Sequence, residues 1–227
     1  MLVECHPHAD PDGWLLENPG FVSGGSLRWW RDQFGPLELA AERDGGGDAY
    51  DLLCAEAAAL GPGADGVVFL PCMQGAMAPE WNGAARGVFY GLALAHTRAH
   101  LTRAILEGCA FALRDILEAM RGAGLEVRRL TIVGGGAKSP LWRQIKADVT
   151  GLPVRVPVSV ETTATGAAIL AAVASGIHSS VAEAATEFIS FRPEEHRPEQ
   201  EAHEAYEVAY RRYREVYFGL KPVFTGT

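Results

Sequence analysis

A short apolar run that leads into three glycines and then a capped helix restricts the fold of this sequence more than any other feature. Residues 130–133 predict a strand, and residues 134–136, all glycine, predict a tight turn. Ser139 and Pro140 then have the composition of a helix cap and a first helical turn. This order is typical of α/β proteins. A turn without Cβ atoms lets a ligand approach the backbone, although a plain tight turn has the same composition.

The remainder of the chain alternates strands and helices without a linker or repeat that would divide it, so we expect one domain over residues 1–227. Strands are predicted over residues 2–5, 14–17, 66–71 and 153–158, the first two as a hairpin around an Asp-Pro-Asp-Gly turn. Helices are predicted from Ser26 as a cap, and over residues 97–122, 163–175 and 199–217.

Side-chain spacing predicts how the two longest helices pack. Apolar side chains recur on one face of the helix over residues 97–122, at Leu101, Ile105, Cys109, Leu113, Ile116 and Met120. The pairs Arg103 with Glu107 and Arg114 with Glu118 are four residues apart, which predicts ion pairs on the opposite face. The aromatic residues of the last helix have the spacing of a core stripe, at Tyr206, Tyr210, Tyr213 and Tyr217.

Charge and composition argue against several classes of protein. The chain has 227 residues, a formal net charge of -8 and no basic cluster interleaved with aromatics, so a nucleic-acid partner is not expected. No apolar stretch approaches about 18 residues, so no membrane partner is expected either. The four cysteines form no C-x-x-C pair, which favours reduced thiols and a cytoplasmic location.

No residue is marked by its sequence setting as catalytic or as a metal ligand. His96 and His100 lack the intervening glutamate of H-E-x-x-H and a third ligand. No G-x-S-x-G motif is present, and no side chain is indicated as a nucleophile or general base. The helix start at Gly24, Gly25 and Ser26 is compatible with an anion contact through free N–H groups, or with a simple cap.

One segment carries a resemblance to a known family. Residues 87–107 (GVFYGLALAHTRAHLTRAILE) combine glycines at the first and fifth positions with His100, Ala104 and Glu107 at fixed spacing. The segment resembles the second signature of the FGGY carbohydrate kinases. Two upstream runs, LPCMQGAMAPEWNGAARG and SGGSLRWWRDQFG, are similar to the same family. Two downstream runs, IVGGGAKSPLWRQIKADVTGLPV and ETTATGAAILAAVASG, are also similar to it, and most similar to xylulokinases.

The resemblance implies a fold and a set of nucleotide contacts. It implies an actin/hexokinase-like (ribonuclease H-like) ATPase domain, with a mixed sheet flanked by helices and ATP in a cleft between two domains. Mg²⁺ is expected to arrive on the ATP phosphates, and no metal ligand is assigned in this chain. Residues implied to border the nucleotide are Gly24, Gly25, Leu27 and Arg28. Those implied to cradle adenosine and its α-phosphate are Gly135, Gly136, Ala137 and Ser139.

The resemblance covers nearly the whole chain but matches only the C-terminal, nucleotide-binding half of these kinases. The N-terminal, sugar-binding half carries the family's aspartate base and D-x-G-T hairpin, and we expect it to be absent here. The implied function is the ATP-binding half of a kinase that transfers the γ-phosphate to a sugar hydroxyl, with a pentulose such as xylulose as substrate. We expect such a half to bind ATP or ADP, to need a complementary half for activity, and to self-associate through exposed apolar surface.

Two alternatives stay open at this point. The chain is also compatible with a non-catalytic module left by truncation of such a kinase, which binds nucleotide or serves as an assembly surface. A neighbouring reading frame with the D-x-G-T hairpin and an aspartate base would argue against that module. A self-sufficient hydrolase on the same fold is the other alternative, but no residue is indicated as its base.

Overall fold

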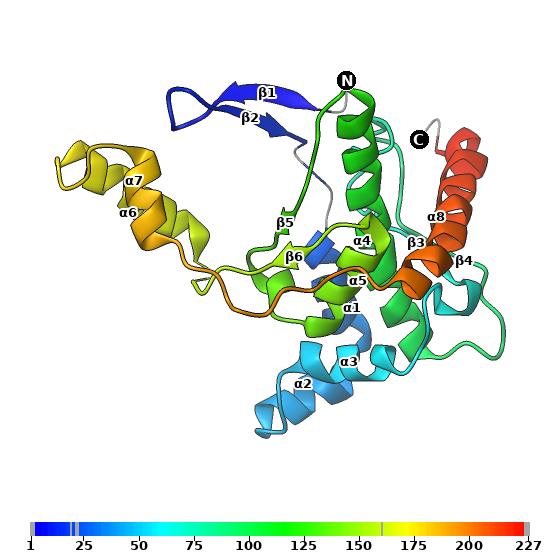
Figure 1. Ribbon diagram of the computed structural model, residues 1–227. Coiled ribbons are helices and arrows are strands. Elements are labelled where there is room, and N and C mark those ends of the chain that lie inside the picture. The colour runs from blue at the N-terminus through cyan, green and yellow to red at the C-terminus, as the bar shows by residue number, and fades with distance from the viewer. Residues whose placement is uncertain (1–2, 19, 21–22, 160, 225–227) are drawn as a thin grey trace.

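The computed structural model describes residues 3–18, 20, 23–159 and 161–224, and the long helix α4 (Arg98–Gly122) lies at the centre of its packing (Figure 1). The predicted helix over residues 97–122 is confirmed, with Thr97 as its cap. The helices and the strand that pack against α4 are α1 (Ser23–Phe34), β3 (Val68–Leu70), α3 (Ala49–Ala58), α5 (Pro140–Thr150) and α8 (Gln200–Leu220), and the turn over Ala64–Gly66 also contacts it. Segments between residues 23 and 220 that lie far apart in the sequence therefore share one core around this helix.

The described strands form three two-stranded sheets, two antiparallel and one parallel. The antiparallel pairs are β1 (Glu4–Pro7) with β2 (Trp14–Glu17), and β3 with β4 (Val88–Tyr90). The parallel pair is β5 (Leu130–Thr131) with β6 (Val154–Arg155). Strands of both directions flanked by helices confirm the predicted α/β class, although the described strands do not join into one continuous sheet.

The other described elements lie around this centre. The remaining helices are α2 (Pro36–Arg43), α6 (Thr162–Ala174) and α7 (Val181–Phe188), and single 3-10 turns are η1 (Ala64–Gly66), η2 (Gly135–Ala137) and η3 (Lys221–Val223). The pair α6 and α7 and the β1–β2 hairpin reach away from the helices around α4 (Figure 1). The hairpin itself was predicted, but its first strand lies over Glu4–Pro7, further along the chain than residues 2–5, and Leu2 lies outside the described residues.

Both predicted ion pairs of α4 form, with Arg114 Nε 3.6 Å from Glu118 Oε1, but the face that carries them is largely covered. The side chains of Arg103 and Glu107 are 6% and 2% exposed, and Arg103 Nε donates to Glu107 Oε1 at 2.7 Å. The Tyr206 hydroxyl of α8 accepts from Arg103 Nη2 at 2.6 Å and donates to Glu107 Oε1 at 3.0 Å. Arg114 is also buried, where it pairs with Glu207 of α8. Helical spacing correctly places these residues on one face, but it cannot show that a later helix covers that face.

The predicted tyrosine stripe of α8 is confirmed as core. All four tyrosines are buried, and Tyr206, Tyr210 and Tyr213 surround the Phe111 ring of α4 at centroid distances of 6.0, 5.9 and 5.3 Å. The hydroxyl of Tyr210 donates to Asp115 Oδ1 at 2.6 Å, so a polar tip is satisfied inside the core. The stripe thus fixes α8 against the central helix.

Gly108 sets how closely α4 approaches β3. A Cβ atom at this position would overlap the carbonyl oxygen of Phe69 in β3. We expect Gly108→Ala to lower the free energy of unfolding by about 1–3 kcal/mol, because helix and strand must move apart in a dense core. Urea denaturation measures the change. Gly122→Ala at the end of the same helix is the control, since its Cβ would meet no described atom within 4 Å, and equal destabilisation by both variants would contradict this account.

Candidate functional site

A cavity of about 470 Å³ opens between the first turn of α1, the start of α3 and the glycine turn η2 that precedes α5. Seven of the eight residues that the sequence predicts as nucleotide contacts line this cavity: Gly24, Gly25, Leu27, Arg28, Gly135, Gly136 and Ser139. The structure therefore brings together two segments that are far apart in the sequence. Their contact with a nucleotide stays a prediction.

Ala137, the eighth predicted residue, does not line the cavity. It is 1% exposed, and its carbonyl oxygen accepts a hydrogen bond of 2.8 Å from Arg143 Nη1. Arg143 lies on α5 and is itself buried, so this bond holds the back of the turn against the helix that follows it. Ala137 therefore supports the turn from behind.

The helix at the first wall begins earlier than predicted. Ser26 is not its cap, because α1 begins at Ser23 and Ser26 is buried within the helix. Because glycine has a low helix propensity, the sequence predicts a helix start that is too far along the chain. Packing of α1 on α4 stabilises the earlier start, and Trp30 Nε1 donates to Thr102 Oγ1 of α4 at 2.9 Å. Gly24 and Gly25 consequently lie in the first turn, where backbone N–H groups have no partner within the helix and favour an anion.

Glycines leave the two walls open for a ligand. A Cβ atom added to Gly24 or to Gly135 would meet no described atom within 4 Å, and both residues line the cavity. A Cβ on Gly136 would lie 3.4 Å from the indole ring of Trp142. The space that side chains would fill at Gly24 and Gly135 is therefore space in which a ligand can approach the backbone.

The start of α5 holds the glycine turn in place. Ser139 is the N-cap, as predicted, and its side chain accepts from the backbone N–H of Trp142 at 3.3 Å, with Pro140 at the first helical position. The indole Nε1 of Trp142 donates to the carbonyl oxygen of Leu106 in α4 at 2.9 Å. The predicted order of strand, glycine turn and capped helix is confirmed, and the central helix anchors it.

The wall formed by α3 was not predicted from the sequence. Asp48 caps this helix by accepting from the backbone N–H of Tyr50 at 2.8 Å, and the guanidinium of Arg31 lies 4.4 Å from the centre of the Tyr50 ring. Asp51 and Cys54 complete this wall, where burial raises the pKa of the Cys54 thiol and keeps it protonated. An aspartate before an apolar run is a helix-start signal that could have found α3, but nothing in the sequence links it to the glycine turn.

Charge divides the cavity into two sides. The carboxylates of Asp48 and Asp51 belong to the α3 wall, whereas Lys138 belongs to the glycine turn. Arg28 points largely to solvent, with its side chain 72% exposed and its Nε 3.7 Å from Asp32 Oδ2. An anionic group is therefore favoured beside the glycines, and hydroxyl groups that can donate are favoured beside the carboxylates.

Other candidate chemistry finds no support in the described part of the chain. The rings of His96 and His100 lie 5.1 Å apart, and His100 Nε2 is 3.1 Å from Asp65 Oδ2. No group of three or more His, Cys, Asp or Glu side chains among the described residues is arranged to hold a metal ion. None of the described helices is both long enough and apolar enough to span a membrane.

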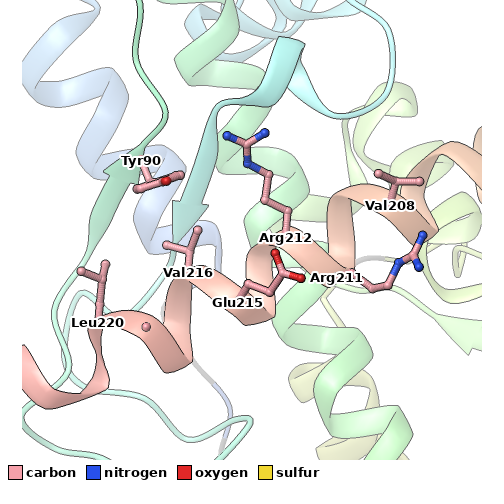
Figure 2. A pocket seen from close by; sticks show the side chains of 8 residues that line it. Tyr90, Val208, Arg211, Arg212, Glu215, Val216 and Leu220 are labelled. Atoms are coloured by element: carbon pink, nitrogen blue, oxygen red, sulfur yellow. The ribbon is translucent and has the colours of Figure 1, made fainter.

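A second hollow lies on the outer face of α8 (Figure 2), with a volume of about 610 Å³. Figure 2 shows Arg211, Arg212 and Glu215 on α8 with Tyr90 of β4 nearby. This hollow is larger than the cavity between α1 and η2, but it lies on the side of a helix. It contains neither a helix N-terminus nor a glycine turn, which are the features that favour a phosphate.

Residues 4–175 match the model of the FGGY family of carbohydrate kinases, C-terminal domain. The chain belongs to this family. The FGGY domain is similar to the gluconokinase of Bacillus licheniformis, with 39% identity over 167 residues that cover 72% of this chain and 32% of that protein. It is 37% identical to the glycerol kinase of Dechloromonas aromatica (strain RCB) over 191 residues, which cover 80% of this chain and 36% of that protein.

Solved structures agree with the family assignment. The crystal structure of xylulose kinase from Rhodospirillum rubrum is 33% identical, with a TM-score of 0.75 over 89% of this chain and 39% of that chain. The predicted resemblance and the actin/hexokinase-like fold class are thereby confirmed. The FGGY domain described here spans about a third of the length of the curated relatives it matches.

Proposed function

We propose that this FGGY domain is the ATP-binding half of a kinase that transfers the γ-phosphate of ATP to a sugar hydroxyl. The observation that carries this proposal is the cavity in which open glycines from two separate segments, Gly24 and Gly135, face a common space beside a helix N-terminus. Backbone N–H groups at a glycine-lined helix N-terminus are suited to bind a nucleotide phosphate, because glycine has no Cβ that would keep the phosphate away from the backbone.

The cavity also fits the remainder of a nucleotide. The ring of Tyr50, held by Arg31, offers an apolar face for a base, and the carboxylate of Asp51 can accept from ribose hydroxyls. ATP, when bound, supplies the phosphoryl group that is transferred, with Mg²⁺ on its phosphates. The residues of this chain bind and orient the nucleotide, and none of them is assigned as the base.

We propose a pentulose such as xylulose as the sugar. The likeness of two segments, IVGGGAKSPLWRQIKADVTGLPV and ETTATGAAILAAVASG, to xylulokinases and the match to a solved xylulose kinase support this choice over gluconate and glycerol, on which other matched relatives act by name. Transfer is proposed to need a complementary N-terminal half, which is consistent with matched relatives about three times as long as the aligned region. A cytoplasmic location, supported by the unpaired cysteines, belongs to the same proposal.

One observation supports the alternative of an assembly module as well as the proposal of a complementary half. Every residue of the two strands β1 and β2 is exposed, including Trp14 at 73% and Leu15 at 44%. A two-stranded hairpin that buries nothing is marginal alone, so a second protein surface is expected to cover it. A complementary kinase half and a second copy of this chain would both serve, and only the first leads to phosphotransfer.

The test combines nucleotide binding with turnover. Calorimetric titration of the chain with Mg-ATP is expected to show binding, while an ADP-release assay with xylulose is expected to show no turnover by the chain alone. Addition of the separately expressed N-terminal half of the R. rubrum xylulose kinase is expected to restore turnover. Failure to bind ATP would favour the assembly module, and turnover by the chain alone would contradict the assignment as half of a kinase.

A further inference from the structure

A buried lysine lies behind the glycine turn. Lys146 is on α5, one helical turn after Trp142, and is 7% exposed. Its Nζ lies 4.2 Å from the centre of the Trp142 ring. The same Nζ is 3.5 Å from the point where a Cβ of Gly136 would stand, so the ammonium group faces the turn from the protein side.

This cation has no anionic partner in the described part of the chain. No ion pair and no hydrogen bond joins Lys146 Nζ to another described residue, in contrast to the buried Arg103, which has Glu107. Cys109 on α4 is the titratable group whose charge acts on Lys146, and burial raises the pKa of that thiol to about 12, so it stays neutral. Burial lowers the pKa of Lys146 to about 8, which reflects the cost of an unpaired buried charge.

The position of the Lys146 ammonium group indicates that an anionic ligand in the cavity could serve as its partner. Gly136 and Trp142, the two residues that lie against Lys146 Nζ, both line the cavity. Because Gly136 has no side chain, no Cβ stands between the ammonium group and the backbone of the turn. A positive charge in a site of low dielectric acts strongly over such a short range. The carboxylates of Asp48 and Asp51 belong to the opposite wall, so the glycine side is the positive end of the cavity.

We propose that Lys146 supplies the buried positive charge that holds a nucleotide phosphate at the glycine turn, an inference that rests on the proposed nucleotide binding. Lys146 is a positioning residue, since it acts through the turn and touches no reacting atom. The bound phosphate provides the negatively charged partner that Lys146 lacks among the described residues of the free protein. The cation therefore lowers the stability of the empty domain and raises its affinity for a phosphorylated ligand.

Three nucleoside ligands separate this role from simple packing. Wild type, Lys146→Met and Lys146→Arg are titrated with adenosine, AMP and ATP, since methionine keeps the length of the side chain and arginine keeps its charge. We expect Lys146→Met to weaken AMP and ATP binding by about tenfold and to leave adenosine binding unchanged. Lys146→Arg is expected to retain most of the phosphate-dependent affinity. Equal losses for adenosine and ATP, or no loss at all, would overturn the proposal.

Two further measurements do not require the methionine variant to bind. The melting temperature of ligand-free Lys146→Met is expected to equal or exceed that of wild type, because the variant removes an unpaired buried charge, whereas a packing role predicts a decrease.

The wild-type affinity for AMP is expected to fall as the pH rises through about 8, as Lys146 loses its proton, and to fall less in Lys146→Arg. An AMP affinity that is independent of pH there would overturn the proposal. Absence of any ATP binding by wild type would instead overturn the proposed function on which it rests.

Discussion

Gly24→Leu is expected to reduce the affinity of the domain for ATP by about 100-fold while the fold stays intact, a loss of about 2.7 kcal/mol in binding free energy. A side chain at this position would project into the cavity, because no described atom lies within 4 Å of the place where its Cβ would stand. Leucine is a better helix former than glycine, so the first turn of α1 should be no less stable. Calorimetric titration with Mg-ATP measures the loss, and circular dichroism checks the fold.

Gly219→Leu is the matched control for this substitution. Gly219 is also a helical glycine whose Cβ would meet no described atom within 4 Å, but it lies on α8 in the hollow of Figure 2. We expect this variant to bind ATP as wild type does. Loss of ATP binding in Gly219→Leu with normal binding in Gly24→Leu would contradict the proposed site and indicate that the nucleotide binds on the outer face of α8.

Glu107→Ala is expected to lower the free energy of unfolding by about 3–5 kcal/mol. The substitution leaves the Arg103 guanidinium, whose side chain is 6% exposed, without its carboxylate, and removes the acceptor of bonds from the Tyr206 hydroxyl and the Gly63 backbone N–H. These bonds join α4 to α8 and to the loop before η1, so several elements lose their connection together. Chemical denaturation followed by tryptophan fluorescence measures the change.

Glu126→Ala provides the comparison for this buried pair. Glu126 also forms an ion pair, with Arg128 at 2.8 Å, but the two side chains are 71% and 81% exposed. Exposed pairs of this kind contribute little, so the denaturation midpoint should not change. Similar midpoints for Glu107→Ala and Glu126→Ala would show that the buried network is not the connection between α4 and α8 that the geometry indicates.

Local sequence patterns predicted the elements of this fold better than their packing. The helix over residues 97–122 and the cap at Ser139 follow from spacing and composition within a few residues, which is where periodicity acts. The burial of Arg103 and Glu107 could not be predicted in the same way, since it depends on α8, which follows nearly a hundred residues later. A polar helix face can be exposed to solvent or buried in a polar network, and its local sequence does not distinguish the two when the segment that covers it lies elsewhere in the chain.

The same limit applies to the candidate site. The family resemblance identified both glycine segments, and the structure places Gly24 and Gly135 at one cavity. The α3 wall with Asp48, and Lys146 behind the turn, escaped prediction because no motif marks them and their place depends on how helices pack around α4. What spacing cannot show is which separate segments become neighbours in space.

Glycine amide resonances offer the most direct test of where the nucleotide binds. The chain contains 26 glycines, so selective ¹⁵N-glycine labelling yields a resolved spectrum in which each wall of the cavity can be assigned by single substitutions. On titration with Mg-ATP, we expect the amides of Gly24, Gly25, Gly135 and Gly136 to shift together with one dissociation constant, while Gly219 stays unchanged. Shifts confined to Gly219 and its neighbours, or no shift at saturating Mg-ATP, would contradict a nucleotide site between α1 and the glycine turn.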